Sequence, residues 1–279
     1  MDTYEFLVDQ ETEDLVENQI RIDSLPAIEV NKISVEAPPD DVEFLAGPRQ
    51  YSQGDTLPDE YRELLIKLIY NHAEILDSEP YATMIESQWR MALEHAPTQL
   101  DLMMMARFHY EELNHGFIFS KILRGLGVDF KNFELRQYLF EYDRKDWLDL
   151  AIHHFLASKV GVMQIAEWND MSYAPIANVV PRVFREERGH AGMGYRHLRE
   201  TCADDKGRET ANERLKTWWP MTLDMFGRSD STRNKRYRAW GLKKHTNAQL
   251  REAFIVDTIP QIEALGLDVP DHLENRRFL

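Results

Sequence analysis

From residue 58 onward, apolar residues recur mainly at the spacing of an amphipathic helix. Positions i, i+3, i+4 and i+7 lie on one helix face, so this spacing predicts helices that bury one side. The alternation typical of strands is scarce. We therefore expect an all-α protein, and several of its helices are followed by a glycine that can end them. The expected helices cover about 58–72, 98–124, 147–169, 176–201, 210–226 and 247–265.

The first fifth of the chain has a different character. Residues 1–60 contain 16 Asp and Glu but three Lys and Arg, whereas the remaining residues contain 32 and 30. Prolines and glycines interrupt this region, and it shows no long helical period. We interpret 1–57 as an acidic N-terminal arm and 58–279 as one helical domain. Two interpretations of the arm remain open: a solvated tail, or a strap that docks on a partner subunit or on the domain's own basic stretch.

Charge and cysteine content exclude several classes of function. A net charge of −15 without a dominant basic face argues against coating nucleic acid or an anionic membrane. No apolar run approaches the roughly 18 residues of a membrane span. The only cysteine, Cys202, cannot form an internal disulfide, and Met1–Glu5 lacks the basic start of a signal peptide. We expect a cytoplasmic protein that binds neither nucleic acid nor membranes.

Two short motifs point to metal chemistry. Glu112–His115 and Glu187–His190 both read Glu-x-x-His, and each lies within a long expected helix. On a helix, i and i+3 share a face, so each motif points a carboxylate and an imidazole the same way. Di-metal carboxylate bundles use Glu-x-x-His on two helices, with one carboxylate from each of the other two. The alternative is that both motifs are ordinary surface or hydrogen-bonded residues.

Several longer motifs in the second half of the chain are specific: Trp218-Trp219-Pro220, Met225-Phe226-Gly227, Thr246–Arg251, Thr258–Glu263 and Leu265–Asp271. With them, the sequence resembles the catalytic alpha subunit of the phenylacetyl-CoA epoxidase (ring-1,2 monooxygenase) family from about Pro58 to Asp271. The resemblance implies a ferritin-like four-helix bundle with additional C-terminal helices, two non-haem iron ions, and O2 as co-substrate. It also implies an acyl-CoA substrate and an oligomer assembled with related oxygenase subunits.

The family's metal ligands transfer only in part. Both Glu-x-x-His motifs match, which assigns Glu112, His115, Glu187 and His190 as ligands. Glu79 is the best match for the carboxylate of the first helix, and Glu74 or Glu86 would replace it if the insertion before Glu112 were placed differently. Glu111 and Glu186, which precede the two metal carboxylates, fit supporting or surface positions better than ligand positions.

The third helix departs from the family pattern. The family's aspartate falls on Ser158, and serine is a poor iron ligand. His154 lies one turn earlier on the same face and is the candidate substitute, whereas Glu167 lies nearer the opposite side. Three outcomes remain open: a di-iron enzyme with altered ligation, a site with one metal, or a relative without oxygenase activity.

A basic stretch with interleaved aromatic residues follows the Met-Phe-Gly motif. It can hold the phosphates of coenzyme A or receive an acidic partner, roles that compete with a solvated loop or with docking of the acidic arm. The candidates for coenzyme A binding are Arg233, Lys235, Arg236, Lys243 and Lys244.

The leading hypothesis is a di-iron monooxygenase subunit that transfers an oxygen atom from O2 to an aromatic or unsaturated acyl-CoA. Its electrons would come from a separate reductase, because one cysteine cannot bind an iron–sulfur cluster. The first alternative is a non-catalytic structural subunit of such a complex, with an incomplete metal site. The second is a ferritin-like protein that oxidises iron without an organic substrate.

Overall fold

The computed structural model describes residues 41–77, 79–128, 139 and 142–278, and for 71–84 it describes the backbone alone. These parts are helical and contain no strand, which confirms the all-α prediction; one isolated bridge pairs Tyr51 with Tyr173. Within them, no helix combines the length and apolar character that crossing a membrane requires. The helices are α2 (Asp59–Asp77), α3 (Glu79–His95), α4 (Gln99–Gly125), α6 (Trp147–Ala166), α7 (Ala174–Ala177), α8 (Val180–Thr201), α9 (Asp205–Asp224), α10 (Thr232–Ala239) and α11 (Asn247–Ala264).

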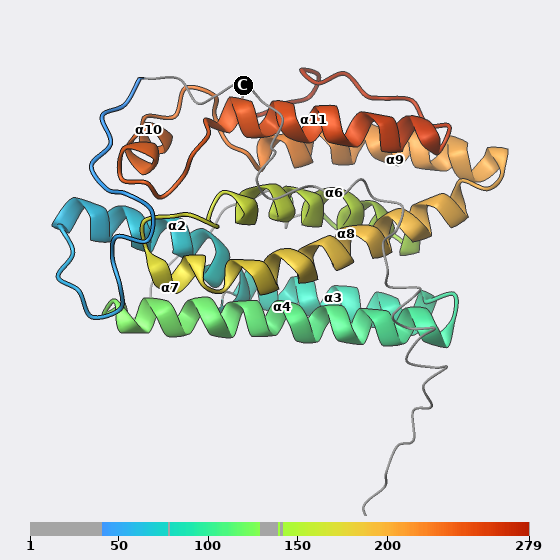
Figure 1. Cartoon of the computed structure of the whole chain (residues 1–279). Coiled ribbons are helices and arrows are strands. Elements are labelled where there is room, and N and C mark those ends of the chain that lie inside the picture. The colour runs from blue at the N-terminus through green and yellow to red at the C-terminus, as the bar shows by residue number, and fades with distance from the viewer. Residues whose placement is uncertain (1–40, 78, 129–138, 140–141, 279) are drawn as a thin grey trace, which may run out of the picture.

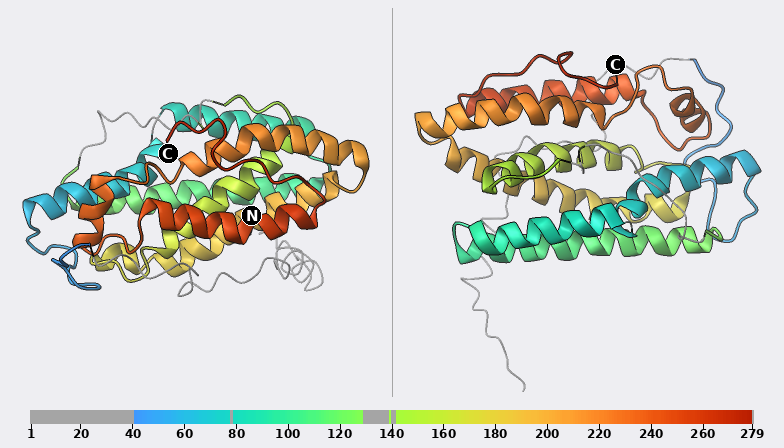
Figure 2. Two further views of the ribbon diagram at one scale, coloured as in Figure 1. Left: turned by 90° about the horizontal axis from the view of Figure 1, so that it is seen from above. Right: turned by 180° about the vertical axis from the view of Figure 1, so that it is seen from behind.

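The long helices stack in three layers (Figures 1 and 2). One layer holds α4 with α2 and α3, the middle layer holds α6 and α8, and the outer layer holds α9 and α11. The first two layers form the ferritin-like bundle, in which α2 and α3 together run beside α4. The outer layer is the predicted C-terminal addition, and it covers α6 through a core that contains the fully buried Trp218 and Trp219.

Local sequence signals explain most helix ends. The side chains of Thr98, Asp146 and Thr246 each accept a hydrogen bond from a backbone N–H of the first turn. Gly227 and Gly266, at φ of 77° and 71°, follow the ends of α9 and α11 as predicted. The expected helix 176–201 is instead α7 and α8, with a proline in the first turn of α8. Helices α3 and α10 were not predicted.

The described part of the acidic arm is docked on the helical domain. Residues 1–40 lie outside the described part of the chain. The carboxylate of Asp41 accepts hydrogen bonds of 2.7 and 3.0 Å from the buried guanidinium of Arg238. The backbone N–H of Leu45 donates to Ala239 O at 2.7 Å, and Tyr51 N–H donates to Ser172 O at 2.8 Å. For residues 41–57, these contacts favour the docked strap over a solvated tail.

Candidate metal centre

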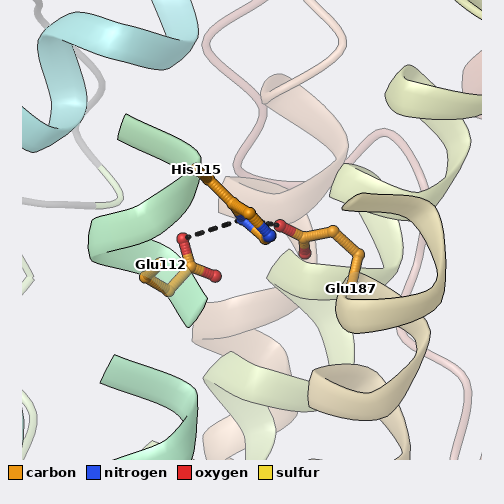
Figure 3. Close-up of side chains that lie close together, drawn as sticks. All are labelled: Glu112, His115 and Glu187. Carbon is orange, nitrogen blue, oxygen red and sulfur yellow. Dashed lines mark ion pairs between the residues drawn. The ribbon is translucent and has the colours of Figure 1, made fainter. Parts of the chain in front are cut away.

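The two Glu-x-x-His motifs meet inside the bundle. One lies on α4 and the other on α8, and these helices run antiparallel, since His115 lies beside Glu186 while Glu111 lies beside His190. Figure 3 shows Glu112 and His115 of α4 pointing toward Glu187 of α8. Three to four residues make one helical turn, so each carboxylate stands next to its own imidazole. The spacing that the sequence suggested therefore produces a shared cluster in which the imidazoles are buried and the carboxylates partly buried.

Both imidazoles turn Nδ1 toward the two central carboxylates. Nδ1 of His115 lies 3.5 Å from Oε1 of Glu187 and 3.9 Å from Oε2 of Glu112. Nδ1 of His190 lies 3.1 Å from Oε1 of Glu112 and 3.9 Å from Oε2 of Glu187. The four side chains thus surround one small space, with a carboxylate and an imidazole from each helix.

The opposite nitrogen of each imidazole binds a carboxylate of the other helix. Nε2 of His115 lies 2.7 Å from Oε2 of Glu186, and Nε2 of His190 lies 2.8 Å from Oε2 of Glu111. Such a carboxylate fixes the ring orientation and leaves the other nitrogen free to bind a metal. Both rings are only 4% exposed, so these contacts decide which way each ring faces.

The cluster's electrostatics favour charge on the imidazoles. Burial alone would lower the pKa of His115, but Glu187, Glu112 and Glu186 raise it to about 9. Burial is likewise outweighed at His190, where Glu111 and Glu112 raise the pKa to about 10. Burial and the charge of Glu112 raise the pKa of Glu187. Without a cation, the excess of negative charge is therefore balanced by protons on the rings.

The donor set fits a divalent transition metal. Glu112, His115 and Glu187 each offer an atom, and these atoms lie within 4.8 Å of one another. Nδ1 of His190 lies 3.1 Å from Oε1 of Glu112 and so faces the same space. A metal ion there would take the place of the proton that this ion pair requires. Carboxylate and imidazole are the ligands that non-haem iron uses.

The other predicted ligands occupy different surroundings. The side chains of Glu74 and Glu79 lie outside the described residues, so their assignment stays a prediction. Glu86 is 70% exposed and pairs with Arg90 at 2.5 Å, so its side chain faces solvent. His154 is buried on α6 behind Phe108, whose ring centroid lies 4.1 Å from that of His154 and 4.6 Å from that of His190. As a ligand, His154 also stays a prediction.

The α6 side of the centre carries small residues. A Cβ built at Gly161 would lie 2.8 Å from Oε2 of Glu187, so this carboxylate packs directly against the α6 backbone. Ser158 is buried one turn earlier. Gly161 was not among the predicted site residues. Glu111 and Glu186 were predicted only as supporting or surface groups, although both motifs read Glu-Glu-x-x-His, which was the available signal for the crossed pairs.

The cations of the basic stretch fall into two groups. Lys235 lies 3.5 Å from Asp41, Arg236 pairs with Glu60, and Lys244 lies 2.7 Å from Asp170. Arg233 and Lys243 form no ion pair among the described residues. Both line a pocket of about 580 Å³. The pocket is framed by the end of α9, by α10 and by one residue each of α2 and α6, and its polar lining includes Gln164, Ser231, Asn234 and Asn247.

Comparison with known proteins places these features in a family. Residues 49–277 match the family described as "Phenylacetic acid catabolic protein". The chain is 29% identical over 233 residues to a protein of Escherichia coli (strain K12) that is named as one of the subunits of 1,2-phenylacetyl-CoA epoxidase. That alignment covers 78% of this chain and 72% of the relative. The chain therefore belongs to the phenylacetic acid catabolic protein family, as its sequence motifs predicted.

Proposed function

We propose that this chain is the metal-binding oxygenase subunit of a multicomponent monooxygenase. Its substrate would be an aromatic or unsaturated acyl-CoA, to which one oxygen atom of O2 is transferred. The proposal is supported by the relative that is named as an epoxidase subunit. The observation that carries it is the cluster of two partly buried carboxylates and two buried imidazoles between α4 and α8. Two iron ions bound there would supply the activation of dioxygen.

Each residue of the cluster has a defined role in this proposal. Glu112 and Glu187 face both imidazoles, so they would hold the metal and offset its charge. His115 and His190 would bind it with the nitrogen that faces these carboxylates, while Glu186 and Glu111 would keep the proton on Nε2. Buried apolar side chains around the cluster, among them the ring beside His190, exclude water from the reacting groups.

We assign the phosphates of coenzyme A to the pocket beside α10. Arg233 and Lys243 are the two basic candidates that line it, together with Arg228, which pairs with Asp230 of the same lining. Neither candidate forms an ion pair within 4.0 Å of an acid among the described residues. Gln164 lines the same pocket and lies three residues after Gly161 on α6, a rise of about 4.5 Å along the helix. The pocket and the metal centre are thus formed in part by neighbouring turns of one helix.

This assignment can be tested by steady-state kinetics. Arg233→Gln and Lys243→Met should each raise the KM for the acyl-CoA by about 10-fold, because each removes a charge-assisted contact to phosphate. Lys235→Met is the matched control, since this neighbouring cation already lies near Asp41. An unchanged KM in both pocket variants would remove the pocket from the proposal.

We also propose that related oxygenase subunits assemble with this chain and that a separate reductase supplies electrons. The relative's name describes it as one subunit of an epoxidase. The outer face of α4 carries a stripe of exposed apolar side chains at helical spacing, a feature typical of protein–protein contact surfaces. The stripe consists of Met103, Tyr110, Leu113 and Phe117.

The activity test combines the purified chain with Fe(II), a reductase, O2, its candidate partner subunits and phenylacetyl-CoA. We expect a product that is heavier by one oxygen atom, which 18O2 labels. Glu187→Gln should abolish product formation because it removes a central carboxylate. If the complete mixture leaves phenylacetyl-CoA and related thioesters unchanged, the proposed reaction is wrong.

One observation favours a second candidate, a non-catalytic structural subunit. The α6 side of the centre presents Ser158 and Gly161, neither of which offers a carboxylate. A structural subunit would assemble with its partners but bind no iron. Metal analysis of the purified chain distinguishes the two candidates.

A further inference from the structure

The packing of α6 against α8 places Ser158 opposite His190. A Cβ at Gly161 would lie 2.8 Å from Oε2 of Glu187, and a Cβ at Gly194 would lie 2.2 Å from Phe155 N. The two helices are therefore antiparallel and closely packed, since a step back along α6 corresponds to a step forward along α8. Ser158 lies three residues before Gly161, and His190 lies three residues after Glu187. In antiparallel helices these two steps run in the same direction, so Ser158 is level with His190.

Neither acidic residue of this region of α6 is available to the centre. Asp149 and Glu167 lie nine residues before and after Ser158, which is about 13.5 Å along the helix in either direction. Asp149 accepts a hydrogen bond from Trp218 Nε1 at 2.9 Å. Glu167 accepts backbone hydrogen bonds of 3.0 Å from residues 244 and 245. Both carboxylates are thus held by other parts of the fold.

His154 does not fill this gap in the described arrangement. It lies one turn before Ser158, and the ring of Phe108 contacts both His154 and His190. Neither nitrogen of His154 forms a hydrogen bond within the described residues. Like that of His190, its ring lies outside the group whose donor atoms converge, which consists of Glu112, His115 and Glu187.

We propose that the metal centre is asymmetric: the position beside His115 binds a metal tightly, and the position beside His190 binds one weakly. This inference rests on the proposed function, because it concerns the same centre. The donor atoms of Glu112, His115 and Glu187 converge within 4.8 Å of one another, whereas His190 is not part of that group. A dication beside His190 would also gain no carboxylate from α6, so we expect it to be held less strongly.

The test is an anaerobic titration of metal-free protein with Co(II), followed by metal analysis after desalting. We expect wild type to bind two ions in separate steps, the second at least about 10-fold more weakly, and to retain about one. Ser158→Asp supplies the absent carboxylate and should retain about two. Asn178→Asp is the matched control, because it adds a carboxylate at the exposed end of α7, outside the centre and the pocket, and it should behave like wild type.

Several outcomes would overturn the inference. Two equally tight ions in wild type would contradict it, and loss of one of them in His154→Ala would identify His154 as the additional ligand. A folded Ser158→Asp variant that retains no more metal than wild type would also contradict it. If wild type binds no metal, the proposed function itself is wrong. This outcome differs from equally tight binding of two ions, which would contradict only the asymmetry. The stepwise titration of wild type decides the matter even if Ser158→Asp does not fold.

Discussion

The crossed contacts between the two helices predict how strongly Glu186 controls metal affinity. Its carboxylate lies 2.7 Å from Nε2 of His115, and it also accepts a 2.9 Å hydrogen bond from Arg182. With a metal on Nδ1, the Nε2 proton of His115 must point toward this carboxylate, which orients the ring and increases its basicity. The side chain of His115 is only 4% exposed, so water cannot easily replace Glu186.

Two substitutions separate the charge of Glu186 from its hydrogen bond. Glu186→Gln keeps an acceptor for the Nε2 proton but removes the charge, and Glu186→Leu removes both. A charge-assisted hydrogen bond contributes about 1.5–3 kcal/mol, and loss of such a supporting carboxylate lowers metal affinity about 10- to 100-fold. We therefore expect about 10-fold weaker Co(II) binding for Glu186→Gln and about 100-fold weaker binding for Glu186→Leu.

The assay is competition for Co(II) with a chromophoric chelator, together with the visible spectrum of the bound ion. A role in positioning His115 should shift that spectrum, whereas a purely structural role would lower thermal stability alone. Glu200→Gln is the matched control, because this glutamate lies 3.4 Å from His197 on the same helix but outside the centre. Wild-type affinity and spectrum in a folded Glu186→Leu variant would show that Glu186 does not position His115.

Three further predictions concern the fold. Gly194→Ala should lower the free energy of unfolding by about 3 kcal/mol or more in urea denaturation, because its Cβ would lie 2.2 Å from Phe155 N; unchanged stability would contradict this packing. Burial lowers the pKa of Lys159 to about 8 from 10.5, so the unfolded chain binds more protons between these values. The free energy of unfolding should consequently rise across that pH range in wild type, and Lys159→Met should remove this residue's contribution to the rise. Asp41→Ala should speed proteolytic cleavage of the docked strap and lower Tm, because it leaves the buried guanidinium of Arg238 without this carboxylate; an unchanged cleavage rate would show that other contacts hold the strap.

Much of the helical architecture could be predicted because its signals are local. Apolar spacing, capping side chains and terminal glycines act within a few residues, so α4, α6, α9 and α11 were expected close to their observed positions. The α3 helix is different, since Pro80 and its polar residues give weak local signals and its place depends on packing against α4 and α6. Short α10 likewise depends on tertiary contacts, including the ion pair between Arg238 and Asp41.

In the candidate site, too, some features follow from local sequence spacing and others from tertiary packing. The order of residues alone establishes that Glu112 shares a helix face with His115, and Glu187 with His190, because i and i+3 positions are neighbours on any α-helix. Whether the two faces meet depends on the fold, since the register between α4 and α8 arises from side-chain packing along the whole bundle. That register brings Glu186 to His115, residues that are 71 positions apart in the chain.

Tertiary packing also decides the role of Ser158, where α6 offers no carboxylate, and the roles of the cations in the basic stretch. A serine at position 158 is visible in the sequence, but the antiparallel packing of α6 and α8 places it opposite His190. A run of cations is equally visible, whereas the fold puts Lys235, Arg236 and Lys244 beside the chain's own acids while Arg233 and Lys243 line a pocket. Local spacing determines which groups share a helix face, but charges and ligands from distant segments meet only where the chain packs.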